Sequence, residues 1–158
     1  MTKLQNISLF LLRISIGWMM FYAGITQVMN PQWSAAGYLQ SAKTFVGFYQ
    51  WLSSPNILPV INFVNEWGLT LLGVSLILGI FVRLSSIMGA VLMLLYYLAI
   101  LDFPYPNSHS FLVDEHIIYI FVLILFASVR AGRFWGLENY WLNLPLANEF
   151  PRLREWLG

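Results

Sequence analysis

The stretch that decides the fold runs from Ser110 to Gly136 and reads SFLVDEHIIYIFVLILFASVRAGRFWG. Two acidic residues and His116 stand near its beginning, Arg130 and Arg133 stand near its end, and no charge lies between His116 and Arg130. As a helix, this part would cover roughly 21 Å at about 1.5 Å per residue. If Arg130 marks one edge of a hydrocarbon core about 30 Å thick, His116 lies inside the membrane. An ionisable group at such a depth is costly and usually has a function.

The composition of the whole chain is typical of an integral membrane protein. Of its 158 residues, 59% are hydrophobic and only 9% are charged, whereas a soluble domain carries about 25% charged residues. The net charge of +1 gives no reason to expect nucleic acid as a partner. The chain has no cysteine, which excludes disulfides, thiolate redox chemistry and thiolate metal sites within it. We therefore expect one membrane domain over residues 1–158, surrounded by lipid.

Hydrophobic length predicts an all-α fold, a bundle of four transmembrane helices. The expected spans cover residues 7–29, 60–82, 84–101 and 111–130. The first is longer than the apolar core of a signal peptide, about 7 to 15 residues, and has no clear cleavage site. Asn30-Pro31 ends it, because the residue before proline disfavours the helical region. The second and third spans are separated only by Arg83 and its neighbours, which predicts an antiparallel hairpin.

Residues 33–54 are too polar to span and mix aromatic with polar side chains. We expect an amphipathic helix in the membrane interface, covering the outer mouth of the bundle. The side chains expected to face inward are those of Phe45, Phe48, Tyr49 and Leu52. Residues 137–158 predict a short surface tail.

The positive charges predict the orientation. With four spans both termini share one side, and seven of the eight cationic residues fall on or near it: Lys3, Arg13, Arg83, Arg130, Arg133, Arg152 and Arg154. Only Lys43 falls on the other side. The positive-inside rule then places both termini in the cytoplasm, in the cell inner (plasma) membrane.

Each span also places a polar side chain in the outer part of the membrane. Counting about 1.5 Å per residue from the inner arginines, Glu66 and Tyr97 lie roughly 25 and 21 Å above Arg83. His116 lies roughly 21 Å above Arg130, and Gln27 stands near the outer end of the first span. Such a ring suits a polar pocket that opens outward.

A quinone headgroup is a cofactor that such a pocket would fit, because it needs hydrogen-bond donors and takes up protons on reduction. His116 and Glu66 could exchange those protons. Gln27 and Tyr97 would orient the ring, and Arg13 would stabilise a polar network. Two further tyrosines complete the expected aromatic wall, Tyr22 and Tyr119.

Structural roles explain the same residues equally simply. Glu66 and His116 could pair only to lock the bundle. Arg13 could reach the nearer surface with its long side chain or anchor a buried network. His109 and His116 are the only histidines and lie near one end of one segment, so they cannot take opposite faces of one iron. No haem or metal is therefore expected within this chain.

Several stretches resemble the DoxX family. They are Leu12 to Gln27, Asn30-Pro31-Gln-Trp33, Phe48 to Leu52, Glu66-Trp67-Gly68 and Gly79 to Leu84. The closing stretch from His116 to Leu137 is similar to DoxD-type proteins, which include the membrane subunit of thiosulfate:quinone oxidoreductase. The resemblance implies a four-helix membrane bundle associated with quinone-linked oxidation. That enzyme uses a separate second subunit, so the resemblance also implies other protein subunits as partners.

The expected function is that of a membrane subunit of a quinone-linked oxidoreductase, acting on a reduced sulfur compound such as thiosulfate. The alternative is a non-catalytic anchoring or assembly subunit of a larger respiratory complex. An enzyme subunit should bind quinone or restore electron transfer, whereas an anchor should only co-purify with its complex.

The charge distribution predicts the result of a topology assay. A reporter fused after Gly158 should behave as cytoplasmic, and a reporter inserted near Asn107 as external, because the basic residues lie at the terminal side. Reporter activity measured in cells checks this. The reverse pattern would overturn the predicted orientation.

Overall fold

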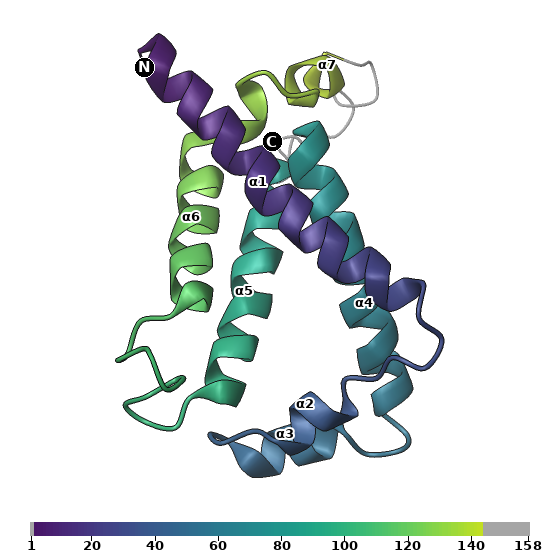
Figure 1. Ribbon diagram of the computed structural model, residues 1–158. Helices are drawn as coiled ribbons and strands as arrows, with labels where there is room; N and C mark the ends of the chain where they lie inside the picture. The colour runs from purple at the N-terminus through teal and green to yellow at the C-terminus, as the bar shows by residue number, and fades with distance from the viewer. Residues whose placement is uncertain (1, 144–158) are drawn as a thin grey trace.

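The computed structural model describes residues 2–143, and within them the fold is helical throughout, without a β-strand (Figure 1). The predicted tail lies outside the described residues from residue 144 onward. The helices in chain order are α1 Lys3–Val28, α2 Ala36–Gln40, α3 Val46–Leu52, α4 Leu58–Leu78, α5 Val82–Ile100, α6 Glu115–Val129, the 3-10 helix η1 Ala131–Arg133, and α7 Glu138–Leu142.

Three of these helices, α1, α4 and α5, are long and apolar enough to cross a membrane, which makes this a multi-pass membrane protein. The apolar helix α6 has 15 residues and a length of about 22 Å. It begins later than the expected span of 111–130, because Asp114 is its N-cap and accepts hydrogen bonds from the main-chain amides of His116 and Ile117. The fourth crossing therefore stays a prediction.

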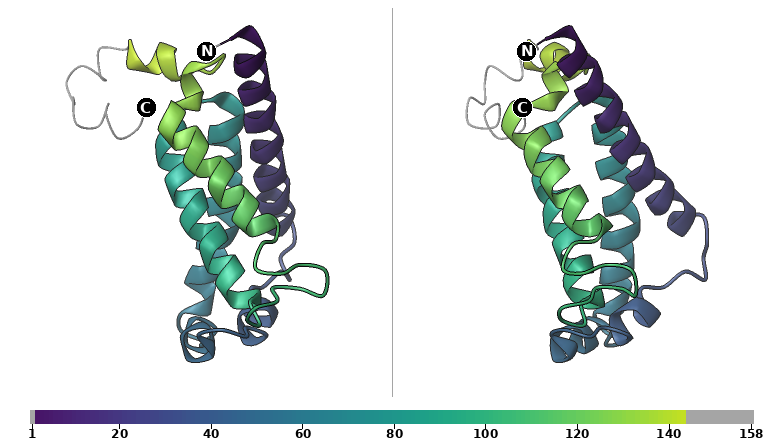
Figure 2. Two further views of the ribbon diagram at one scale, coloured as in Figure 1. Left: turned by 90° about the vertical axis from the view of Figure 1, so that its left-hand side faces the viewer. Right: turned by 60° about the vertical axis from the view of Figure 1, so that its left-hand side comes forward.

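The four long helices form two antiparallel pairs, α1 with α4 and α5 with α6 (Figures 1 and 2). The N-terminus, η1 and α7 lie at one end of the bundle, which we call the terminal end. The helices α2 and α3 and the loop of residues 101–114 lie at the opposite end, the loop end (Figure 1). The hydrophobic core contains buried side chains from all four helices, including Met20, Leu76, Met93 and Leu123.

Glycines allow α1 and α4 to pack at close range. A Cβ atom at Gly17 would lie 2.9 Å from Leu76 Cβ, and one at Gly24 would lie 2.5 Å from Thr70 Oγ1. A Cβ atom at Gly73 would overlap the main chain of Phe21. Small residues at such positions let the two backbones approach, which is how helices in membranes gain much of their packing energy.

Residues 33–54, which we call the cover segment, lie across the loop end (Figure 1). They are bonded to the last turn of α5, whose carbonyls have no donor within the helix. The Lys43 amide donates to Ala99 O at 2.8 Å and the Thr44 hydroxyl donates to Leu101 O at 2.6 Å. One turn earlier, the Tyr49 hydroxyl donates to the carbonyl of Leu95 at 2.6 Å.

The cover segment differs from the expected single helix, because it consists of α2 and α3. Phe45, with φ of 50°, interrupts the helical backbone between them and changes the direction in which the later side chains point. Tyr49 is buried as expected, and Leu52 packs against a second cluster around it. Phe45 and Phe48, expected to face inward, are instead 63% and 46% exposed. The depth of the segment in a membrane stays a prediction.

The close glycine packing between α1 and α4 predicts unequal effects for two identical substitutions on α4. Gly73→Ala should lower the free energy of unfolding by about 1–3 kcal/mol, because the new methyl group meets the Phe21 backbone. Gly68→Ala is the matched control, since a Cβ atom there meets nothing within 4 Å. Thermal unfolding in detergent measures both. Equal stability of the two variants would contradict the close approach of α1 and α4.

Candidate functional site

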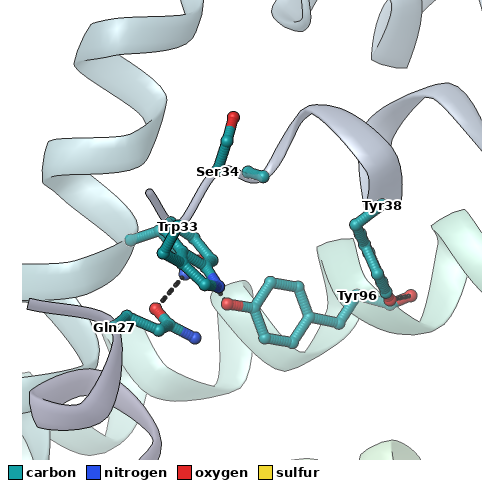
Figure 3. Close-up of a pocket in the computed structure, with 7 residues that line it drawn as sticks. Gln27, Trp33, Ser34, Tyr38 and Tyr96 are labelled. Carbon is teal, nitrogen blue, oxygen red and sulfur yellow. Dashed lines mark hydrogen bonds between the residues drawn. The ribbon is translucent and has the colours of Figure 1, made fainter. Parts of the chain in front are cut away.

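A polar cavity of about 260 Å³ lies at the loop end, beneath the cover segment. Its walls come from the end of α1, the link to α2, α2 itself, α4 and α5. The residues that line it are Gln27, Trp33, Ser34, Ala35, Tyr38, Asn65 and Tyr96 (Figure 3). All of these side chains are uncharged at neutral pH, so the cavity is polar without being ionic.

Asn65 holds the cavity together. Its side chain is buried, its Nδ2 donates to Gln27 Oε1 at 2.8 Å, and its Oδ1 accepts a hydrogen bond from the Tyr96 hydroxyl. These bonds join α1, α4 and α5 through three side chains. A buried amide whose oxygen and nitrogen are both bonded has a fixed orientation, so the neighbouring groups are held in place as well.

Two hydrogen-bond donors in the cavity wall remain available. Within residues 2–143, neither the amide nitrogen of Gln27 nor the indole nitrogen of Trp33 has an acceptor. The hydroxyl groups of both tyrosines in the wall are already hydrogen-bonded. The Tyr96 hydroxyl donates to Asn65 Oδ1, and the Tyr38 hydroxyl donates to Tyr96 O at 2.8 Å (Figure 3). Burial is the main reason why the pKa of Tyr38 is raised, so this hydroxyl stays protonated. The cavity therefore offers donors to a ligand that carries acceptors.

His116 stands behind Tyr96 rather than in the cavity wall. Its Nδ1 lies 2.7 Å from Asp114 Oδ2, and its ring meets the Tyr96 ring edge-on at 6.1 Å between centroids. The expected partner of His116 was an acid on another span, but the acid that it contacts is the N-cap of its own helix. An acid–base pair thus lies next to the polar cavity, with one aromatic ring between them.

The structure separates the residues predicted for the site. Gln27 lines the cavity, as the polar ring suggests. Glu66 is half-buried on α4 and, within the described residues, forms no ion pair with His116. Tyr97 turns away from the cavity, and its hydroxyl donates to Leu112 O at 2.5 Å. Glu66 and Tyr97, which were expected to line one pocket together, are therefore not part of the wall of the polar cavity.

Two further tyrosines also lie elsewhere. Tyr22 is 60% exposed and stacks on Trp18, so it faces the surroundings of the bundle rather than the cavity. Tyr119 is half-buried and packs against the core. Neither belongs to the wall of the polar cavity.

Two of the cavity residues that the sequence leaves unidentified are the immediate predecessors of two that it favours. The structure places Asn65 in the wall instead of Glu66, and Tyr96 instead of Tyr97. A signal exists for Asn65, because it shares a helical face with the buried residues Leu69 and Leu76. On α5 no such signal exists, because both Tyr96 and Tyr97 are flanked by apolar residues on every side.

Arg13 lies at the other end of the bundle and is fully buried. Its guanidinium donates to Ala131 O at 2.9 Å and to Trp135 O at 3.4 Å. A Cβ atom at Gly79 would lie 2.7 Å from the Arg13 guanidinium carbon, and one at Gly136 would lie 2.6 Å from its Nη1. Of the two roles open to Arg13, the structure shows the buried network.

Glu138 lies beside Arg13 and Arg133, and we call these three residues the arginine cluster. Nothing in the sequence pattern singles out Glu138. Its side chain is fully buried, with Oε1 3.6 Å from Arg133 Nε, and it packs directly on Gly132. Burial raises the pKa of Glu138, and the nearby Arg133 offsets part of that effect. The cluster joins α1, the α4–α5 turn and the chain after α6, so its role is to hold the terminal end together.

Comparison with known families identifies one match, to the DoxX family model over residues 8–101, more than half of the chain. The matched part extends from α1 to the end of α5 and includes every residue that lines the polar cavity. It stops before His116 and before the residues that bind Arg13. No curated protein and no solved structure matches the chain. Within residues 2–143, no three histidine or acidic side chains gather as a possible metal site.

The arginine cluster predicts a large and coupled effect on stability. Arg13→Met should cost about 3–5 kcal/mol, because it leaves the carbonyls of Ala131 and Trp135 without their donor and removes one of the positive charges near the buried Glu138. The double variant Arg13→Met with Glu138→Gln should cost less than the sum of the two single changes, by about 0.5–3 kcal/mol. Thermal unfolding measures all three. Lys3→Met, at the exposed start of the same helix, is the control and should stay within about 0.5 kcal/mol. Strict additivity would show that Arg13 and Glu138 do not interact.

Proposed function

This chain belongs to the DoxX family, and from that premise we propose that it is a membrane subunit of a quinone-linked oxidoreductase. The polar cavity is the proposed site of the quinone headgroup. The observation that carries the proposal is the bonded series Gln27–Asn65–Tyr96, which lies next to the acid–base pair His116–Asp114.

The chemistry of the cavity wall favours a neutral, flat ligand with acceptor groups. The free donors of Gln27 and Trp33 suit the carbonyl oxygens of a quinone. Aromatic side chains of Trp33, Tyr38 and Tyr96 supply faces and edges for a planar ring. No charged side chain in the described part of the chain lines the cavity, so a carboxylate or phosphate would find no counter-charge there, whereas a quinone needs none.

The acid–base pair supports the protonation steps. Reducing a quinone to a quinol adds two electrons to the ring and one proton to each of its two oxygens. In this proposal His116, whose Nδ1 contacts Asp114, supplies protons past the edge of Tyr96. Glu66, half-buried one residue after Asn65, is a proposed second proton donor. The electrons would come from a reduced sulfur compound, such as thiosulfate, oxidised on a partner subunit.

The charge distribution supports an orientation for this proposal. Lys3, Arg13, Arg83, Arg130 and Arg133 belong to the terminal end of the bundle, which is proposed to face the cytoplasm from the inner membrane. The polar cavity would then open on the opposite side, where the sulfur compound and the partner subunit approach.

One observation favours the alternative of an anchoring or assembly subunit. Phe45, Phe48 and Trp51 are exposed on the cover segment, outside the spanning helices, and Trp51 is 58% exposed. Such a surface fits a protein partner as well as a membrane interface. Quinone binding by the isolated chain discriminates the two functions, because an anchor has no need of it.

The proposal predicts that quinone binding depends on the Tyr96 hydroxyl. Tyr96→Phe should weaken binding of a benzoquinone with one isoprenoid unit about tenfold, because Asn65 loses the donor that orients it. Tyr22→Phe is the matched control, since Tyr22 is exposed on α1 and is not part of the cavity wall. Titration of the purified protein in nanodiscs measures both. Absence of quinone binding by the unaltered protein would favour the anchoring function instead.

The proton role makes a separate prediction. His116→Ala should leave quinone binding within about twofold and reduce quinone-linked turnover per assembled complex about 10²- to 10⁴-fold. Turnover and thermal stability are measured together, so that loss of folding is not mistaken for loss of chemistry. Full turnover in the assembled variant would remove His116 from the mechanism.

A further inference from the structure

Two more hollows continue from the polar cavity. The first is an apolar cavity of about 140 Å³ under the cover segment, which we call the inner cavity. Four residues line both it and the polar cavity: Ala35, Tyr38, Asn65 and Tyr96. The rest of its wall is apolar except for Tyr49, whose hydroxyl is already bonded to Leu95 O. The polar cavity therefore adjoins a space suited to hydrocarbon.

The second hollow is a groove of about 540 Å³ between α4 and α5. It shares Val64, Leu92 and Leu95 with the inner cavity and extends to Ile80 and Phe81 at the far end of both helices. From residue 64 to residue 80 the groove follows roughly 24 Å of helix. It is thus long, and it begins where the inner cavity ends.

The α4–α5 groove is apolar over its whole length. Among residues 2–143, its only polar side chains are Ser75 and Ser85. Their hydroxyls lie 2.6 Å apart and bond to one another, and the Ser75 hydroxyl also bonds to Ile80 O at 2.5 Å. Neither serine therefore has a free hydroxyl proton to donate to a polar ligand. Several groove residues are exposed on the outer surface of the bundle, among them Val64, Leu71 and Met88.

We propose that these three hollows form one binding site for an amphiphile, with its polar ring in the polar cavity and a long polyprenyl tail in the α4–α5 groove. The inference rests on the proposed quinone function and specifies the ligand as a long-chain quinone. Its tail passes through the inner cavity beside Leu92 and Leu95. The open side of the groove makes the bilayer itself the entry route, between α4 and α5.

The groove contributes to binding mainly by positioning the quinone, and not by the burial of its hydrocarbon tail. Hydrocarbon in the bilayer is as apolar as the leucines of the groove, so the tail gains little by leaving the lipid. A tail that fits the groove is instead restricted to one path, which aligns the ring with the donors of the polar cavity. Blocking that path should therefore affect long-chain quinones and spare short ones.

The test compares two quinones that differ only in tail length, a benzoquinone with one isoprenoid unit and one with eight or more. Leu95→Trp, at the junction of the inner cavity and the groove, should weaken binding of the long-chain quinone at least tenfold while changing that of the short one less than twofold. Val64→Trp, at the same junction on α4, provides a second variant of the exposed groove wall. Ile87→Trp is the control, because Ile87 is exposed on α5 outside the groove.

The outcomes separate this inference from the function on which it rests. If both quinones bind and Leu95→Trp and Val64→Trp weaken them equally or not at all, the tail does not lie in the groove, and the headgroup site stands. If the unaltered protein binds neither quinone, the proposed function fails and this inference with it. A long-chain quinone with a photoreactive group at the tail end should label residues near Phe81 and Leu84. Labelling confined to α1 or α6 would overturn the path.

Discussion

The rest of the structure depends on the burial of one guanidinium. An arginine stays charged in any protein, so Arg13, which is fully buried, requires acceptors brought to it from elsewhere in the chain. Ala131 and Trp135 supply the carbonyls and Glu138 supplies a neighbouring negative charge. This requirement fixes the course of the chain after α6, which has to pass close to α1 and to the turn at Gly79.

The two ends of the bundle use opposite chemistry for the same purpose of joining helices. At the terminal end the links are charged, dense and inaccessible, and glycines provide the space for them. At the loop end the links are the neutral groups of Gln27, Asn65 and Tyr96, and they surround an open cavity. A densely packed charged cluster and an open polar cavity thus lie at opposite ends of the bundle.

Three of the four expected spans correspond to helices that are long and apolar enough to cross a membrane, because hydrophobic length alone defines them, whereas most of the cavity wall could not be predicted in this way. The expected spans 60–82 and 84–101 correspond to α4 and α5, whose ends lie one to four residues earlier, since the left-handed conformations of Gly79 and Phe81 make the turn earlier than Arg83 suggests. The selection of Glu66 and Tyr97 misses the cavity by one position each. On a helix that is apolar on every face, composition does not reveal which face meets a neighbour, and one residue changes the direction by about 100°. The burial of Glu138 depends on contacts that exist only in the assembled bundle.

The distance along the chain between Arg13 and its acceptors has a consequence for biosynthesis. The bond to Ala131 O joins residues 118 positions apart. At a synthesis rate of about 5–20 residues per second, Arg13 is synthesised roughly 6 to 24 s before that carbonyl exists. During this interval the Arg13 side chain has to reach toward the nearer membrane surface for water. The hydrogen bonds that hold Arg13 inside the bundle can therefore form only after nearly all of the described chain has been synthesised.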